Sequence, residues 1–236
     1  ATMIRQAENL REEKSHSVSL SADMYRRFGA FQCNLLLEGF YTRLNHVFVL
    51  EEIGKDEEHN AVIKERRNGQ GAEVAGVTVE GKVAYLSLVQ LQAGVTWQKS
   101  HYTRPEKWSK DSSVPAEKRI FRTPDWYGYF TATYSPVKPL NIALSGTYTG
   151  SMIVQHMKGY IPKDMAVTTP DFFDMNLKIS YDFSLYKFIT LQLNAGVQNI
   201  FNAYQRDFDQ GKERDSGYIY GPSMPRSYFD GAKLMF

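Results

Sequence analysis

Long apolar runs, paired cysteines and a surplus of one charge are all missing from this sequence of 236 residues. Without about 18 consecutive apolar residues, the chain offers no transmembrane helix. Its single cysteine, Cys33, excludes an internal disulfide. The 28 basic and 26 acidic residues leave a net charge of +2, which lacks the basic excess of nucleic-acid-binding proteins. Segment 1–8 also lacks the basic and apolar regions of a signal peptide, so an exported form is expected to be matured or cut from a longer chain.

Catalytic and metal-binding patterns are equally scarce. None of the five histidines pairs with another at ligand spacing, and neither H-E-x-x-H nor C-x-x-C occurs. Ser15-His16 and Ser100-His101 are adjacent pairs, but neighbours on a strand point to opposite faces. The acidic segments 51–58 and 207–213 lack EF-hand spacing and are interpreted as solvated loops. We therefore expect no catalytic residue, no metal site and no cofactor.

Alternation of apolar and polar residues is the dominant positive signal. It runs through Val89–Gln98, Ile189–Gln198 and Phe173–Phe183, where every second residue is apolar. A period of two is typical of a strand with one apolar face. The pattern predicts nine strands, at 16–26, 30–45, 70–81, 84–102, 121–135, 140–155, 171–183, 187–202 and 225–236. Many of them reach or exceed the ~9–11 residues with which a strand spans a bilayer.

The connections between these strands alternate in length. Short ones are predicted near Arg27–Gly29, Gly81-Lys82, Ser135–Pro139 and Ser184–Tyr186, and long polar ones at 46–69, 103–120, 156–170 and 203–224. Short turns on one side and long loops on the other are the layout of an outer-membrane β-barrel. Several aromatics fall near strand ends, as in the girdles of such barrels: Trp97, Trp126, Tyr134, Tyr181, Phe183, Tyr228 and Phe236.

The last strand supports the same interpretation. Phe236, Leu234, Ala232, Asp230 and Tyr228 share one face, which is mostly apolar and has an aromatic residue at each end. The strand follows a long loop, so Phe236 is expected at the periplasmic rim. The predicted fold is all-β, an antiparallel transmembrane β-barrel. A soluble β-sandwich, whose strands also alternate, is the alternative.

Two segments resemble a known family. Gly196–Tyr204 contains the run V-Q-N-I-F-N, and Tyr220–Arg226 ends in P-R before the last strand. Both are similar to the C-terminal region of TonB-dependent outer-membrane receptors, whose penultimate strand leaves through V-x-N-L-F-(D/N). Glu8–Ser15 is similar to the family's N-L-K-P-E element, with Glu12 where proline is usual. The resemblance covers nearly all of the chain.

The resemblance implies a C-terminal portion of a barrel, about nine strands of a 22-stranded one. Residues 1–15 are expected to form an extracellular lead-in and 16–236 the barrel part, without the plug domain. The function implied is active uptake of a scarce nutrient, such as a ferric siderophore, cobalamin, haem or a glycan, in the cell outer membrane. The implied partners are outer-membrane lipid, the plug and remaining strands of the same receptor, TonB through the missing N-terminal part, and the small-molecule ligand. Asp230, on the lipid-facing row, departs from the family pattern.

Candidate site residues follow from these expectations. Tyr127 and Tyr129 share the predicted lumen face of one strand near its outer end, and they are the candidate ligand contacts. Tyr228 and Phe236 are the candidate assembly signal in the last strand. An outer-membrane phospholipase or protease and a soluble β-sandwich binding domain remain alternative functions.

Overall fold

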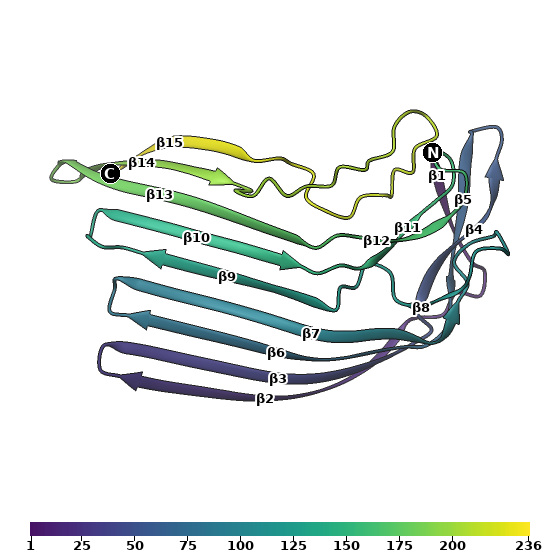
Figure 1. The fold of residues 1–236 in the computed structure, drawn as a ribbon, viewed down its shortest axis with the longest axis horizontal. Coiled ribbons are helices and arrows are strands. Elements are labelled where there is room, and N and C mark those ends of the chain that lie inside the picture. Colours follow the sequence, from purple (N-terminus) through teal and green to yellow (C-terminus); the bar gives the residue numbers. More distant parts are fainter.

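The computed structural model describes residues 1–236 and contains strands but no helix. No helical segment is therefore available to cross a membrane. Nine long strands form one continuous sheet in which every neighbouring pair is antiparallel (Figure 1). In spatial order they are β2 (Lys14–Phe28), β3 (Phe31–Asn45), β6 (Ala72–Tyr85), β7 (Val89–Glu106), β9 (Trp126–Tyr134), β10 (Leu140–Thr149), β13 (Phe172–Tyr186), β14 (Ile189–Gln198) and β15 (Ser227–Met235).

These strands confirm the nine predicted from alternation, with shifted bounds. One predicted turn is wrong, because Gly81 and Lys82 lie inside β6, where they pair with Leu35 and Asn34. The β6–β7 connection is instead the turn Leu86–Leu88. Glycine weakens a strand signal, but at this position the two neighbouring strands hold the backbone in the ladder.

The two faces of the sheet differ sharply in chemistry. Side chains of directly paired residues lie on the same face, and faces alternate along each strand. One register row runs through Ala22, Leu37, Val79 and Val95. A row of the opposite face runs through Gln92, Thr131, Ser145 and Asn176. We call these the apolar face and the polar face.

Aromatic residues mark the outer end of the apolar face, where the long loops begin. From β3 to β15 they are Tyr41, Trp97, Trp126, Tyr148, Phe173 and Tyr228. Followed from β3 to β15 through the paired residues, their positions shift by eight residues in total toward the short-turn end, over seven pairs of neighbouring strands. With standard strand dimensions this is roughly 26 Å along the strands against roughly 34 Å across them. A level aromatic girdle thus requires a strand tilt of roughly 38°, within the roughly 35–45° typical of barrels.

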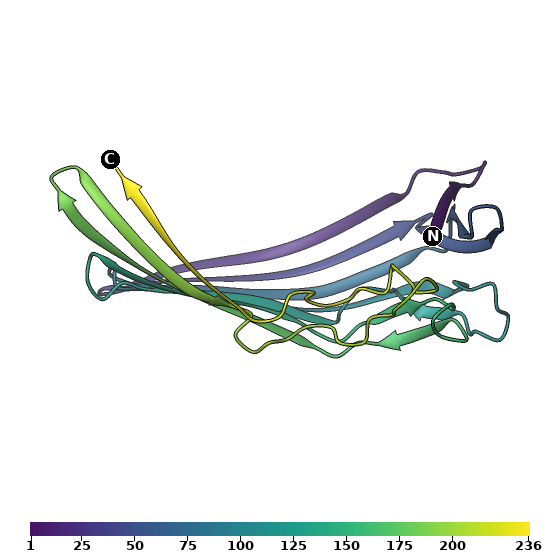
Figure 2. The ribbon, with the colours of Figure 1, turned by 90° about the horizontal axis from the view of Figure 1, so that it is seen from above.

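The nine strands form a single curved layer, and no second sheet packs on either face (Figure 2). Large apolar side chains such as Leu20, Leu37 and Leu91 are consequently 82%, 49% and 44% exposed on the apolar face. A β-sandwich buries that face between two sheets, so the soluble alternative is wrong. The sheet is one section of a barrel wall, with β2 and β15 at its two edges.

Short strands in the outer connections were not predicted from the sequence. β1 (Thr2–Gln6), β5 (Ala61–Asn68) and β4 (Phe48–Asp56) form a three-stranded sheet in which β1 is parallel to β5. β11 (Ile153–His156) pairs with β12 (Met165–Thr168), and β8 (Glu117–Arg119) extends the main sheet beside β7. All of them lie at the end of the sheet opposite the short turns (Figure 1). The C-terminal residue Phe236 lies at the short-turn end of the sheet (Figure 1).

Candidate functional site

The outer connections meet around a cleft of about 530 Å³. Its walls come from the β4–β5 hairpin, from the segment after Trp108, from residues 157–162 and from residues 212–216. Six basic side chains line it: Lys55, Lys64, Lys110, Lys158, Lys212 and Arg214. Only Glu52, Glu213 and Asp215 oppose them, and Asp215 already accepts hydrogen bonds from the backbone N–H groups of Met157 and Gly217. The cleft therefore presents a surplus of positive charge to a ligand.

The β4–β5 hairpin is held against the main sheet by one arginine that forms ion pairs with two glutamates. Arg67 of β5 donates from Nε to Glu51 at 2.6 Å and from Nη2 to Glu106 of β7 at 2.8 Å. Glu106 also accepts the backbone N–H of Gln70 at 3.0 Å. The Glu106 side chain is 6% exposed and that of Arg67 is 28% exposed. Because this pair is shielded from water, it fixes one wall of the cleft more firmly than a surface salt bridge would.

A second wall depends on the segment between β14 and β15, which contains no regular secondary structure (Figure 1). Gln205 is fully buried at its centre. Its side chain donates to the carbonyl of Tyr218 at 3.0 Å and accepts the N–H of Tyr220 at 2.9 Å. The side-chain amide of Gln205 thus satisfies two backbone groups of the loop, which in the sheet are satisfied by neighbouring strands.

Asp207 and two tyrosines form the next layer of this segment. The hydroxyl of Tyr218 donates to Asp207 at 2.7 Å, and that of Tyr220 donates to the other carboxylate oxygen. Burial alone would raise the pKa of Asp207, but these two hydrogen bonds hold that pKa below its ordinary value. Burial and the nearby carboxylate raise the pKa of Tyr220 to about 12 and that of Tyr218 further still. Both tyrosines are thus neutral donors, and Asp207 is engaged inside the protein.

His156 ties this segment to β11. Its ring stacks on Tyr218 with centroids 3.7 Å apart and planes 4° apart. Its Nε2 lies 2.8 Å from Asp209, and the two side chains are 9% and 2% exposed. Arg122 makes a parallel connection, donating to the carbonyls of Gly217 and Ile219 at 2.6 and 2.7 Å. Asp207 and Asp209, two of the three acidic residues of segment 207–213, therefore hold the loop together.

The motif residues Asn199 and Asn202 organise the exit from β14. Asn199 is buried and has a φ of 53°, a left-handed conformation that asparagine tolerates. Its side chain bonds the N–H and carbonyl of Ala203 at 2.9 and 2.8 Å and the carbonyl of Met224 at 3.0 Å. Asn202 accepts the N–H of Arg226 at 2.9 Å. The two asparagines hold both ends of the loop together at the entry to β15.

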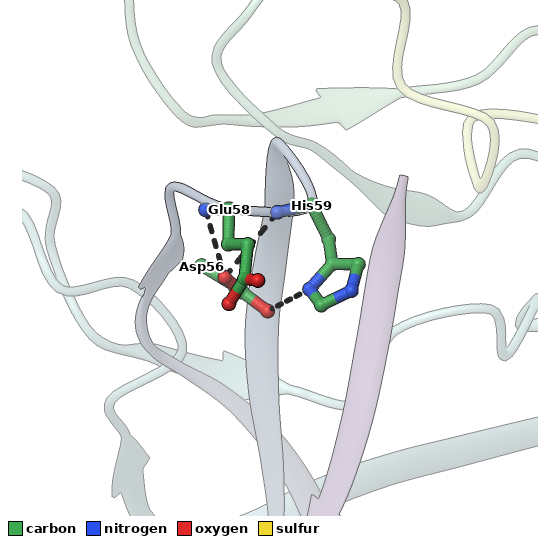
Figure 3. A group of neighbouring side chains, drawn as sticks. All are labelled: Asp56, Glu58 and His59. Carbon is green, nitrogen blue, oxygen red and sulfur yellow. Dashed lines mark hydrogen bonds and ion pairs between the residues drawn. The ribbon is translucent and has the colours of Figure 1, made fainter.

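Asp56, Glu58 and His59 meet at the tip of the β4–β5 hairpin, where their potential ligand atoms lie within 4.8 Å of one another (Figure 3). Asp56 accepts the N–H of Glu58 at 3.0 Å and lies 2.7 Å from Nδ1 of His59. The bond with His59 lowers the pKa of Asp56. These contacts are those of an aspartate that caps a turn, and they explain why the three side chains gather there.

The predicted ligand contacts lie away from the basic cleft. Tyr127 and Tyr129 are on the polar face of β9, opposite Thr96 and Gly94 of β7. Their exposed fractions are 39% and 38%, and the hydroxyl of Tyr129 accepts a hydrogen bond from Gln92 at 3.0 Å. Tyr228 and Phe236 are 73% and 87% exposed. Asp230 lies on the apolar face opposite Ala195. The roles of all four aromatic residues remain predictions.

The cleft lysines were missed by sequence reasoning because they are scattered between residues 55 and 212 without a motif. The long polar loops indicated only the region. To predict this cluster of lysines, one would have to know which loops meet. The alternation within single strands does not contain that information.

Comparison with known proteins agrees with this geometry. A family model described as "TonB dependent receptor-like, beta-barrel" matches residues 1–200. No curated protein sequence matches the chain.

Three solved structures illustrate the likeness in fold. The ferric-catecholate import receptor Fiu of E. coli K12 superposes with a TM-score of 0.61 at 17% identity, covering 97% of this chain and 28% of that one. The ferric enterobactin receptor of Pseudomonas aeruginosa, as a point mutant, gives 0.58 at 16%, covering 96% and 32%. The FrpB iron transporter of Neisseria meningitidis gives 0.57 at 13%, covering 99% and 33%. The chain spans about a third of the length of these receptors.

Proposed function

Because this chain belongs to the family of TonB-dependent receptor β-barrels, we propose that it forms part of the wall and of the ligand-collecting outer surface of an importer for an anionic ferric chelate. The observation that carries this proposal is the basic cleft between the outer loops, with six cationic side chains against three carboxylates. Ferric catecholates carry net negative charge, whereas cobalamin and most glycans do not. The names of the similar structures, which include ferric-catecholate and ferric enterobactin receptors, support the same ligand class.

The remaining parts of the importer are proposed from the family. Its place is the cell outer membrane, where the apolar face contacts lipid and the polar face contacts a plug domain carried by another part of the same receptor. TonB would act through that part. In this arrangement Tyr127 and Tyr129 contact the ligand after it leaves the cleft, because they line the polar face below the loops. Nothing in this scheme needs a catalytic residue.

The test uses the complete receptor that carries this segment, with Lys110→Gln and Lys158→Gln combined. Each removed charge is worth about 0.2–1 kcal/mol at an exposed site, so we expect roughly tenfold weaker binding of ferric enterobactin. Equilibrium titration measures it, with a neutral ferric chelate as the comparison ligand.

The matched control is Lys138→Gln, which removes the same charge from the short β9–β10 turn at the opposite end of the sheet. It should bind like the unaltered receptor. Unchanged affinity of the double variant for ferric enterobactin, with correct folding, would contradict the proposal. Equal weakening for the neutral chelate would show that charge is not what the cleft recognises.

A further inference from the structure

A row of ionisable residues crosses the apolar face immediately outside the aromatic girdle. His16, Arg43, Glu73, His101 and Arg119 are successive register partners on β2, β3, β6, β7 and β8. Lys14 lies two residues outward from His16 on β2, and Lys99 lies beside the row on β7. Since paired residues share a face, all of these side chains project on the same side as the exposed leucines and valines.

The aromatic girdle fixes the height of this row relative to a membrane. Arg43 is two residues outward from Tyr41, and Lys99 is two residues outward from Trp97. Two residues advance roughly 6.6 Å along a strand, which at the tilt inferred above is roughly 5 Å of height. Girdle aromatics lie at the boundary between hydrocarbon and headgroups, so Arg43 and Lys99 lie at the level of the headgroups.

Ion pairing leaves the positive charge of the row concentrated at one end. Glu73 lies 3.5 Å from His101, and Asp125 lies 2.8 Å from Lys99. Arg43 has no carboxylate within 4.0 Å, and Lys14 has only the exposed Glu12, at 3.8 Å. Lys14, His16 and Arg43 are all exposed and lie on the two adjacent strands β2 and β3. We call these three residues the β2–β3 cationic patch.

The other half of the sheet has no equivalent patch. The residues two positions outward from the girdle on β9, β10, β13 and β15 are Pro124, Gly150, Asp171 and Arg226, of which Arg226 is the one cation. Asp171 accepts a hydrogen bond from the hydroxyl of Tyr148 at 3.1 Å. A general need for cations beside the membrane would spread them along the whole girdle, whereas Lys14, His16 and Arg43 gather on β2 and β3 and Arg226 stands alone on the other half. The asymmetry points to a local ligand.

We propose that the β2–β3 cationic patch binds the phosphate group of a phosphorylated lipid headgroup in the outer leaflet. The guanidinium of Arg43 has the fork geometry that matches phosphate oxygens, and Lys14 and His16 add further N–H donors. Tyr41, 42% exposed directly below Arg43, packs against the part of the lipid that links headgroup to acyl chains. This proposal rests on the membrane position proposed above, but it involves a face that the transported ligand does not touch.

The experiment uses the complete receptor in nanodiscs of a zwitterionic phospholipid, titrated with bis-phosphorylated lipid A, with bound lipid counted by native mass spectrometry. Combining Lys14→Gln and Arg43→Gln removes two charges at the headgroup level. Each is worth roughly fivefold near an anionic membrane surface, so we expect roughly thirtyfold weaker retention. The charge-keeping pair Lys14→Arg and Arg43→Lys should retain the lipid.

The matched control is Lys82→Gln with Lys178→Gln, which removes two charges from the polar face of β6 and β13. It should retain the lipid as the unaltered receptor does. Equal retention by the patch variant would overturn the proposal, as would displacement of the lipid by inorganic phosphate at the same phosphate concentration, because the site would then take a free anion. Ferric enterobactin binding should be unchanged in the patch variant, so failure here is distinguishable from failure of the uptake function.

Discussion

The strand region and the outer loops of this protein solve the problem of stability in opposite ways. Of 236 residues, 24 are buried, and all except Thr96, near the middle of β7, lie in the outer connections or in the outer half of a strand. The inner half of the sheet keeps its apolar side chains exposed. It depends on the backbone ladder, because 110 of the 131 backbone hydrogen bonds lie within strands, and on a lipid solvent for its apolar face.

The outer loops, in contrast, are held by polar side chains that are themselves buried. Gln205, His156, Asn199 and Asp164 are each at most 7% exposed, and each bonds a partner from another part of the chain. Only two small apolar clusters of three residues accompany them. Buried polar groups stabilise a fold only when all of them have hydrogen-bond partners. A single substitution in the loops should therefore destabilise the loop around it. A single substitution on the apolar face of the strands should instead act by changing the contact of that face with lipid.

The largest loss of stability is expected from a substitution at the centre of the apolar face. Leu35→Arg places a charge in the hydrocarbon, and we expect a loss of roughly 2–4 kcal/mol of unfolding free energy. The neighbouring Leu36→Arg is the control, because Leu36 faces the polar side between Asp23 and Glu80. Denaturant titration of the complete receptor in lipid measures both. Equal losses for the two arginines would show that the face assignment is wrong.

The loops should respond to loss of one buried amide. Gln205→Ala leaves the carbonyl of Tyr218 and the N–H of Tyr220 without their partner, which costs roughly 2–3 kcal/mol of local stability. Hydrogen exchange should speed up in residues 199–224 and stay unchanged in β13 and β14. Gln210→Ala, at an exposed site of the same loop, should change neither. Faster exchange across the whole sheet would mean that loops and strands unfold as one unit.

Alkaline pH alone should destabilise the loop between β14 and β15. The pKa of Tyr220 is raised from 10.0 to about 12 in the folded loop. The tyrosine therefore contributes its full stabilisation below pH 10, and this is lost as pH rises from 10 through about 12 while the unfolded form ionises first. Exchange rates in 199–224 should rise over that window in the unaltered receptor. Tyr220→Phe should reduce the rise and leave the part that Tyr218 contributes, and an unaltered pH profile in that variant would count against Tyr220.

The smallest effect on stability is expected at the end of β15. Phe236 is 87% exposed, so Phe236→Ala should change the free energy of unfolding in lipid by less than about 1 kcal/mol. If Tyr228 and Phe236 form the assembly signal, the same change should reduce insertion into the outer membrane, read as a loss of heat-modifiable mobility on gels. Leu185→Ala, an exposed apolar residue in the β13–β14 turn region, is the matched control. Normal insertion of the Phe236 variant would refute the signal.

Much of the strand region could be predicted because its determinants are local. A period of two assigns each residue of β7 or β14 to a face without knowledge of its neighbours. Gly81 shows the limit: it breaks the local pattern, yet pairing with Leu35 keeps it in the ladder. The loops had no such period, so neither the β4–β5 hairpin nor the pairing of β1 with β5 was predicted.

Almost none of the candidate site could be predicted from local sequence patterns. Tyr127 and Tyr129 could be assigned to the polar face from parity alone, and the structure places them there. Lys55, Lys110 and Lys158 come together only because three separate connections fold over one another. The acidic residues Asp207 and Asp209 were interpreted as solvated, whereas each has a specific partner within the fold.

The sequence by itself determined the nine strands, the face of each side chain and the family, because alternation and short motifs act over a few residues. The tertiary structure alone decided the strand tilt shown by the girdle, the charge of the cleft and the cationic patch on β2 and β3. Each of these depends on register between strands or on contact between distant loops. Lys14, His16 and Arg43 form no motif in the chain, and only the pairing of β2 with β3 places His16 opposite Arg43, one row above Tyr41, with Lys14 one row further out.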